Sequence, residues 1–224
     1  MVNRCGARLR HLLPEAPTAA QEEQLDQSIA VVSDFRAAHA YPLTKVTVGV
    51  RRFVQHEAAV VVVAQRLKRL PQIVHKLRRM PGSQLARMED VGGCRAVLND
   101  LDEVQRVRMR ITQRWDVKRE RDYIEAPKET GYRGVHLVVE RDGRRIEVQL
   151  RTAGQQQWAD AVERTAGRLG MPLKDGEGDD RVLAYFRAAG EGIFLVEARR
   201  ELDETFLAYF EAARAAAAQA GYFR

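Results

Sequence analysis

The segment from residue 134 to residue 151 constrains the fold of this chain more than any other. Two runs of alternating polar and apolar residues, 134–140 and 145–151, flank the dipeptide Asp142-Gly143. Asp-Gly between two such runs is the strongest short signal for a β-hairpin, because both residues tolerate the positive φ of a two-residue turn. The sequence therefore predicts a hairpin whose register is fixed by its turn.

This register divides the hairpin into two faces, since alternate side chains of a strand point to opposite sides. One face is apolar and pairs Leu137 with Val148. The other is polar, and its predicted pairs are Val138–Glu147, His136–Gln149 and Gly134–Arg151. The carboxylate of Glu147 is thus expected among polar and cationic neighbours. A solvated sheet surface shows the same alternation, so the hairpin alone does not decide the function.

The loop before the hairpin combines cations with an aromatic ring. Pro127 and Lys128 lead into Gly131-Tyr132-Arg133. Stacking of an aromatic ring on a nucleobase contributes roughly 1–3 kcal/mol, and Lys or Arg beside it binds phosphate. The loop therefore fits a base with a phosphate, although Tyr132 could equally pack the loop itself.

A first upstream cluster contains only cations. Residues 60–65 are predicted to form a strand buried on both faces, which would deliver Arg66 and Lys68 to one side at its C-terminal end. Ligand sites of α/β proteins lie at such strand ends. Lys76 is expected on the helix that follows, over residues 70–79.

A second upstream cluster contains Asp90, Gly92-Gly93 and Arg95. Paired glycines let the backbone pass close to another group, although they more often mark a turn, and an Asp oxygen suits Mg²⁺. Asp90 and Glu147 thus accompany six cations: Arg66, Lys68, Lys76, Arg95, Lys128 and Arg151. Two carboxylates for a metal and many cations for phosphates are what phosphoryl or pyrophosphoryl transfer requires.

In order and spacing these clusters resemble the synthetase domain of the RelA/SpoT family, whose members are pyrophosphokinases that move the β,γ-diphosphate of ATP onto a 3′ hydroxyl. The resemblance covers about residues 55–165. Four motifs carry it: R-x-K with a following lysine (Arg66, Lys68, Lys76), D-x-x-G-x-R (Asp90, Gly93, Arg95), the run 122–136, and E-x-Q-x-R-T at residues 147–152.

The resemblance implies a role for each donor-side residue. Arg66 and Arg95 would enclose the adenine of ATP, and Lys68 and Lys76 would hold its phosphates. Asp90 would ligate Mg²⁺ as one of two catalytic carboxylates.

The other catalytic carboxylate, Glu147, would share that metal or accept the proton of the attacking hydroxyl. Tyr132 would stack on the acceptor base. The resemblance places four further residues around the acceptor and the diphosphate: Lys128, His136, Gln149 and Arg151.

The acceptor itself is less constrained, because this chain departs from the family pattern at Gln72, Gly134 and residues 160–164. A formal charge of +6, from 37 Lys and Arg against 31 Asp and Glu, favours a polyanionic partner. Some toxin members of the family that this chain resembles modify the 3′-CCA end of tRNA, so the resemblance together with the charge places that acceptor slightly ahead, and it implies a toxin that inhibits translation and a possible antitoxin partner. The rival acceptors are guanine or adenine nucleotides, giving an alarmone such as (p)ppGpp or ppApp.

A different class of function also fits the composition. A basic α/β domain could bind RNA through Tyr132 and its cations, with Asp90 and Glu147 as ordinary surface acids. Such a domain gains nothing from two acids among its cations, and metal-dependent consumption of ATP would discriminate between the two hypotheses.

For the whole chain we predict an α/β (α+β) fold, a mixed sheet flanked by helices, of the nucleotidyltransferase-like RelA/SpoT type. The expected parts are a helical N-terminal extension (1–55), the synthetase core (56–165) and a helical C-terminal extension packed on the core (166–224). Periodicity predicts helices at 21–39, 44–55, 181–189 and 193–220. The absence of a long apolar run predicts no membrane insertion, and two cysteines without metal-ligand spacing fit a reduced, cytoplasmic protein.

Overall fold

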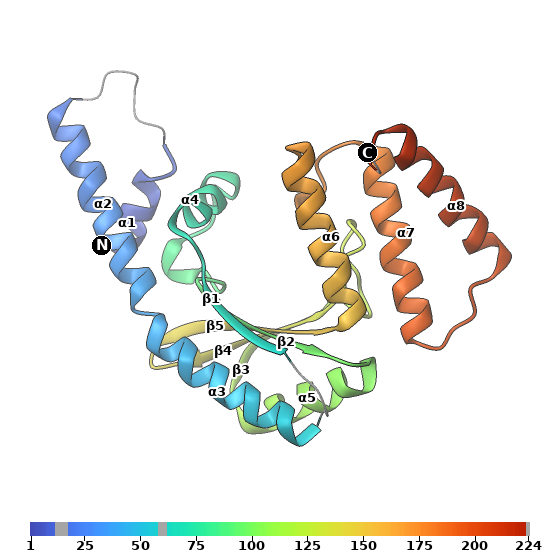
Figure 1. Ribbon diagram of the computed structural model, residues 1–224. Coiled ribbons are helices and arrows are strands. Elements are labelled where there is room, and N and C mark those ends of the chain that lie inside the picture. Colours follow the sequence, from blue (N-terminus) through green and yellow to red (C-terminus); the bar gives the residue numbers. More distant parts are fainter. Residues whose placement is uncertain (12–17, 58–61, 223–224) are drawn as a thin grey trace.

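The computed structural model describes residues 1–11, 18–57 and 62–222, which build a five-stranded mixed sheet (Figure 1). The strands follow the order β1-β2-β5-β4-β3, in which β2 and β5 run parallel and the other neighbours antiparallel. Their bounds are Val62–Leu67 (β1), Gly92–Leu98 (β2), Val117–Asp122 (β3), Val135–Arg141 (β4) and Arg144–Thr152 (β5). This confirms the predicted α+β class with a mixed sheet.

Helices lie on both sides of the sheet (Figure 1). In chain order they are α1 (Val2–Arg8), α2 (Ala19–Ala37), α3 (Ala40–Glu57), α4 (Leu70–Arg79), α5 (Leu101–Arg114), α6 (Ala153–Leu169), α7 (Asp180–Glu197) and α8 (Glu204–Gln219). Helices α3 and α5 cover one face. On the opposite side α6 packs on β5 and β2, α7 packs on α6, and α8 packs on α7, while α1, α2 and α4 form a separate group beside β1.

The main core lies between the sheet and the helices α3 and α5. Alternate residues of β5, including Ile146 and Val148, are fully buried there. They meet apolar residues of α3 spaced three or four apart, such as Val46 and Val50. Burying each such side chain contributes roughly 1.5–3 kcal/mol, so this layer holds the sheet and leaves its other face for polar side chains.

The β4–β5 hairpin has the predicted register. Val138 pairs with Glu147 and His136 with Gln149, and the ladder begins at the pair of Val135 with Leu150, one residue inside the predicted Gly134–Arg151 pair. Asp142 and Gly143 both have positive φ, at 49° and 69°. The Asp-Gly turn therefore sets the face on which Glu147 lies.

The prediction for the first strand was wrong in two respects. Strand β1 is not buried on both faces, because it is an edge strand that pairs only with β2, and Val62 is 63% exposed. It is also antiparallel to β2, so the strand-end argument from parallel sheets does not apply to it. Residues 60 and 61 of the predicted strand lie outside the described residues. Helix α4 matches the predicted bounds.

The paired glycines belong to strand β2 and do not form a loop. A Cβ on Gly92 would lie 2.9 Å from Cδ1 of Ile146, so a larger residue there would displace the end of this side chain on β5. Cys94 follows in the same strand and is buried, and burial raises the pKa of its thiol to about 12. This cysteine fills space in the core and is not a reactive thiolate.

The C-terminal helices break at a different place from the predicted one. Helix α7 continues through residues 190–192, where we expected an interruption, and ends at Glu197. The real break contains Arg199, whose φ is 54°, and Asp203, whose side chain caps α8 by accepting from the Phe206 N–H. No helix in the described part of the chain is long and apolar enough to cross a membrane.

Candidate active site

One face of the sheet collects the polar residues singled out from the sequence. In the register of β1, β2 and β5, Arg66 pairs with Gly93, which pairs with Glu147. Laterally paired residues point to the same side, so the same face carries five more of the predicted site residues or their neighbours: Arg95, Gln149, Arg151, His136 and Arg121. This face is opposite the α3–α5 core.

The donor side of this face centres on Asp90, immediately before β2. Its two oxygens accept from the ammonium groups of Lys68, at 2.7 Å, and Lys76, at 2.9 Å. Burial opposes the ionised form of Asp90, but the two ammonium groups hold its pKa below the usual value. The carboxylate therefore keeps the ammonium group of Lys68, directly after β1, close to that of Lys76 on α4 in the free protein.

The two arginines assigned to adenine are diagonal neighbours across β1 and β2, since Arg66 pairs with Gly93 and Arg95 with Ala64. The Nε of Arg95 is buried without a hydrogen-bond partner among the described residues. Burial, then the charges of Arg151 and Arg66, lower the pKa of Arg95. An unpaired buried guanidinium donor is costly unless a ligand supplies an acceptor, so this position suits a bound polar molecule.

Glu147 is held in place by hydrogen bonds to both of its oxygens. Nδ1 of His136 lies 2.9 Å from Oε1, and the amide of Gln149 donates to Oε2 at 2.6 Å. Although burial favours the neutral acid, these bonds keep the pKa of Glu147 below its usual value. The side chain is thus an oriented, ionised carboxylate, which is the form a general base or a metal ligand requires.

Tyr132 and His136 extend this arrangement. Burial raises the pKa of the Tyr132 hydroxyl, which accepts from Arg151 at 3.0 Å and contacts Nε2 of His136. A carboxylate only accepts, so the His136 tautomer that fits both contacts donates from Nδ1 to Glu147 and accepts a hydrogen bond from the Tyr132 hydroxyl at Nε2. A chain of hydrogen bonds therefore runs from Arg151 through Tyr132 and His136 to Glu147.

The remaining acceptor-side cation, Lys128, lies over two aromatic rings. Its Nζ is 4.8 Å from the ring centre of Tyr123 and 5.0 Å from that of Tyr132. Burial, together with nearby cations that include Arg121 and Lys76, lowers the pKa of Lys128, while Glu147 opposes the shift. Lys76 of the donor side and Lys128 of the acceptor side thus act on each other.

Asp90 and Glu147 suit a divalent cation that arrives with its substrate. Their charges interact, since Asp90 opposes the lowering of the Glu147 pKa. No group of three or more His, Cys, Asp or Glu in the described residues forms a complete protein metal site. Mg²⁺ commonly binds through one or two carboxylates plus substrate phosphates and water, so the donor set fits that ion.

Sequence reasoning missed the residues that anchor the loop at 128–133, which is called the acceptor loop below. Arg133 was interpreted as a phosphate-binding cation, but its side chain is 6% exposed, donates to the Ile124 carbonyl and pairs with Glu191 of α7. Its guanidinium also lies 4.0 Å from the ring centre of Phe194. Beside it a Cβ on Gly190 would come closer than 3.0 Å to the carbonyl oxygen of Gly131. Helix α7 therefore fixes the loop from behind.

Sequence reasoning also assigned no role to Tyr123. Its ring contacts Tyr132 and His136 edge to face, at centroid distances of 5.8 and 5.2 Å. The sequence feature that could have identified Tyr123 is its position in the Asp-Tyr-Ile run, shortly before the loop at 128–133. Asp122 of the same run is structural, because it accepts from the N–H groups of Ile124 and Glu125 and pairs with Arg108.

Comparison with known proteins agrees with this geometry. Residues 65–166 match the family model described as a region found in RelA/SpoT proteins. The chain is 32% identical over 126 residues to the GTP pyrophosphokinase YjbM of Bacillus subtilis, covering 50% of this chain and 60% of that protein. It is 29% identical over 110 residues to the GTP pyrophosphokinase YwaC of the same organism, covering 42% and 52%. The matches therefore span a little over half the length of these relatives.

The fold has solved counterparts. The small alarmone synthetase 1 of Bacillus subtilis, in a crystal structure with its product pppGpp, superposes with a TM-score of 0.61 at 24% identity, covering 75% of this chain and 93% of that one. Small alarmone synthetase 2 of the same organism gives a TM-score of 0.57 at 21% identity. Residues 65–166 of the chain thus match the RelA/SpoT family model, and the chain shares the fold of the small alarmone synthetases.

Proposed function

We propose that this protein is a Mg²⁺-dependent pyrophosphokinase that transfers the β,γ-diphosphate of ATP to a 3′ hydroxyl. The observation that carries the proposal is Glu147, an ionised carboxylate oriented by His136 and Gln149 between one set of cations on β1, α4 and β2 and another around the loop 128–133. The two relatives named GTP pyrophosphokinases support it.

On the donor side, Arg66 and Arg95 would enclose the adenine. Lys68 and Lys76 would give up their ion pairs with Asp90 and bind the phosphates instead. Mg²⁺, when held by Asp90 and Glu147, would neutralise charge on the diphosphate. The protein contributes position and electrostatics, since phosphoryl-transfer chemistry needs no covalent protein intermediate. The ion pairs of Asp90 in the free protein keep both lysines where the phosphates would arrive.

On the acceptor side, Tyr132 would stack on the acceptor base, and Lys128 and Arg151 would bind phosphate charge. A Glu147 oxygen would accept the proton of the 3′ hydroxyl while the hydroxyl oxygen forms the new bond to the β-phosphorus. The bond from the β-phosphorus to the oxygen bridging to the α-phosphate breaks, and AMP leaves with that oxygen. His136 would hold Glu147 in the orientation that this proton transfer requires.

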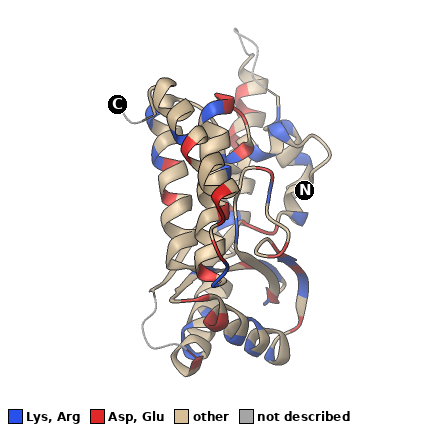
Figure 2. Cartoon of the chain, turned by 90° about the vertical axis from the view of Figure 1, so that its right-hand side faces the viewer, with Lys and Arg blue, Asp and Glu red and all other residues tan. Residues whose placement is uncertain are grey.

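We place a guanine nucleotide first among the acceptors, because both named relatives are GTP pyrophosphokinases. The adenine nucleotides remain alternatives within the same class. This reverses the slight preference for tRNA that the charge balance suggested. Figure 2 supports the change, since acidic and basic residues intermingle on the side of the molecule that it shows.

The tRNA 3′ end is kept as a second acceptor because of one observation on the edge strand β3. Arg119 and Arg121 of this strand share a single carboxylate, Glu89, with Arg145, at 3.5, 3.3 and 3.7 Å. Three guanidinium groups against one acid leave excess positive charge beside the acceptor loop, which suits a nucleic-acid backbone. Inhibition of translation and an antitoxin partner would follow only from this acceptor.

The test is incubation of the purified protein with γ-³²P-labelled ATP and Mg²⁺. Separate reactions receive GDP, GTP, ADP, AMP or deacylated tRNA, with EDTA and Glu147→Gln as controls. We expect label on guanine nucleotides and none after chelation. Label on tRNA alone would indicate a translation-blocking toxin instead of an alarmone synthetase. No transfer to any acceptor would contradict the proposed enzyme class.

A further inference from the structure

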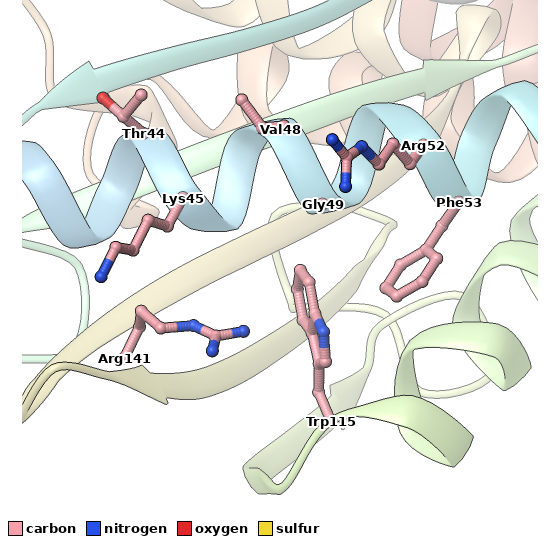
Figure 3. A pocket seen from close by; sticks show the side chains of 8 residues that line it. All are labelled: Thr44, Lys45, Val48, Gly49, Arg52, Phe53, Trp115 and Arg141. Carbon is pink, nitrogen blue, oxygen red and sulfur yellow. The ribbon is translucent and has the colours of Figure 1, made fainter.

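An open cavity of about 540 Å³ lies away from the catalytic face (Figure 3). Helix α3 forms one wall, Trp115 between α5 and β3 forms another, and Arg141 closes it at the end of β4. Because α3 packs on the apolar face of the sheet, the cavity is on the side opposite Glu147. It is large enough for a small ligand, since such sites span roughly 300–1,000 Å³.

The aromatic wall of the cavity depends on a glycine. A Cβ on Gly49 would lie closer than 3.0 Å to the indole carbons of Trp115, so only glycine lets this ring approach α3. The indole also packs on Phe53, with ring centres 5.0 Å apart. Val48, which is 41% exposed, adds apolar surface beside them. The cavity therefore offers rings and apolar atoms to a planar ligand.

The other walls are cationic. Arg141 extends toward Trp115, with its guanidinium carbon 5.8 Å from the ring centre, and its Nε is buried without a hydrogen-bond partner among the described residues. Lys45 pairs with Asp142 at 2.9 Å, but both side chains are about two-fifths exposed, so this pair can open. Arg52 and Arg141 have no carboxylate partner in the part of the chain that the structure describes. Three cations thus face one acid.

We propose that this cavity is a second binding site, for a nucleotide, separate from the catalytic face. The phosphates would bind Arg52 and Arg141, with Lys45 released from Asp142 to assist. The base would pack against Trp115 and its apolar neighbours. Uncompensated guanidinium groups select an anion, and the aromatic wall and the volume favour an anion that carries a planar ring over inorganic phosphate. The proposal does not depend on the reaction at Glu147.

The chain offers a direct reporter, because Trp115 and Trp158 are its two tryptophans. In a Trp158→Phe protein the remaining fluorescence comes from Trp115, in the cavity wall. We expect saturable quenching by GMP, AMP and GDP, and at least about tenfold weaker binding of ribose 5-phosphate, which lacks the base. No saturable quenching by any nucleotide, or equal binding of ribose 5-phosphate, would overturn the proposal.

Variants of the cavity residues test whether the quenching comes from nucleotide bound in the cavity. Arg52→Gln and Arg141→Gln in the Trp158→Phe background should each weaken nucleotide binding at least about tenfold, equal to about 1.4 kcal/mol. Arg51→Gln is the matched control, since this neighbour on α3 donates to the Val63 carbonyl and does not line the cavity. Arg52 is exposed, so its variant should fold even where Arg141→Gln does not.

Lys68→Gln separates this site from the catalytic face. We expect it to leave the quenching of Trp115 unchanged, because Lys68 belongs to the Asp90 cluster. If Lys68→Gln abolished the quenching while Arg52→Gln did not, the nucleotide would be bound on the catalytic face, and the cavity would not be a site.

Discussion

The donor and acceptor halves of the candidate active site are built in different ways. In the acceptor half, His136 and Glu147 are only 10% and 12% exposed and belong to a continuous hydrogen-bond chain backed by α7. In the donor half, the corresponding group is a set of ion pairs in which Lys76 is 29% exposed and Asp90 23%. The hydrogen bonds of the acceptor half hold its side chains in fixed positions, whereas a ligand can break the ion pairs of the donor half and rearrange its charged side chains.

Among the variants that test this contrast, Glu147→Gln should have the largest effect. The amide keeps the shape of the side chain but can neither accept the proton nor carry charge, so we expect kcat to fall about 10²–10⁴-fold with the fold intact. Steady-state transfer from labelled ATP measures the loss, and circular dichroism checks the fold.

Glu140→Gln on the neighbouring strand is the matched control, because this exposed glutamate faces Arg145 at the outer end of the hairpin. It should transfer diphosphate at the wild-type rate. Wild-type activity in Glu147→Gln would remove the catalytic assignment and leave Glu147 as a structural partner of His136.

Tyr132 separates stacking from hydrogen bonding. Tyr132→Ala should lower kcat/KM for the acceptor by about tenfold to a hundredfold, the equivalent of roughly 1–3 kcal/mol of base stacking, while KM for ATP changes little. Tyr132→Phe keeps the ring but loses the hydroxyl that contacts Arg151 and His136.

We expect the Phe variant to keep most of the acceptor affinity and to lose part of kcat, because His136 is then less firmly oriented toward Glu147. Equal loss of acceptor and ATP affinity in the Ala variant would contradict the stacking role.

Gly190 tests whether α7 fixes the acceptor loop. In Gly190→Ala the added Cβ would clash with the Gly131 carbonyl, so we expect a loss of about 1–3 kcal/mol in the free energy of unfolding and a raised acceptor KM. Gly167→Ala in α6 is the control, because nothing lies within 4 Å of its Cβ position. Removing a helical glycine there should stabilise the protein by about 0.5–1 kcal/mol. A stabilising Gly190→Ala would refute the contact.

Two glycines, Gly143 and Gly190, explain what the sequence could and could not predict about the fold. Asp142-Gly143 acts locally, so the register of the hairpin and the face of Glu147 followed from neighbouring residues. Gly190 acts through Gly131, 59 positions away in the sequence, and a glycine in a helical pattern normally argues for an interruption. Its tolerance inside α7 depends on a tertiary contact that periodicity does not reveal.

The candidate site shows the same division. Residues with a chemical signature were brought together on one face, because their motifs follow strands whose pairing aligns them. The supporting residues were not found, since Arg133 has the charge of a phosphate ligand and its true partner, Glu191, is 58 positions away. The exposure of β1 was also missed, because a run of valines is compatible with an edge as well as with a central strand.

The smallest effect concerns Asp90 and acid stability. Its pKa is lowered in the folded protein, so it stabilises the fold fully above its usual pKa, and this contribution disappears as the pH falls toward the folded value. Asp90→Asn loses that contribution and leaves two ammonium groups facing each other. We expect the variant to be less stable at pH 7, with the difference shrinking below about pH 4, in urea titrations without Mg²⁺ or ATP.

Lys76→Gln sharpens this test, because one of the two ammonium groups that hold Asp90 ionised is removed while Lys68 remains at 2.7 Å. Its stability curve should lie between those of the wild type and Asp90→Asn. Parallel curves for all three proteins across the acid range would show that the ion pairs contribute nothing to the free protein. The donor half would then acquire its order only from the ligand, and the contrast with the pre-oriented acceptor half would be larger than the free structure implies.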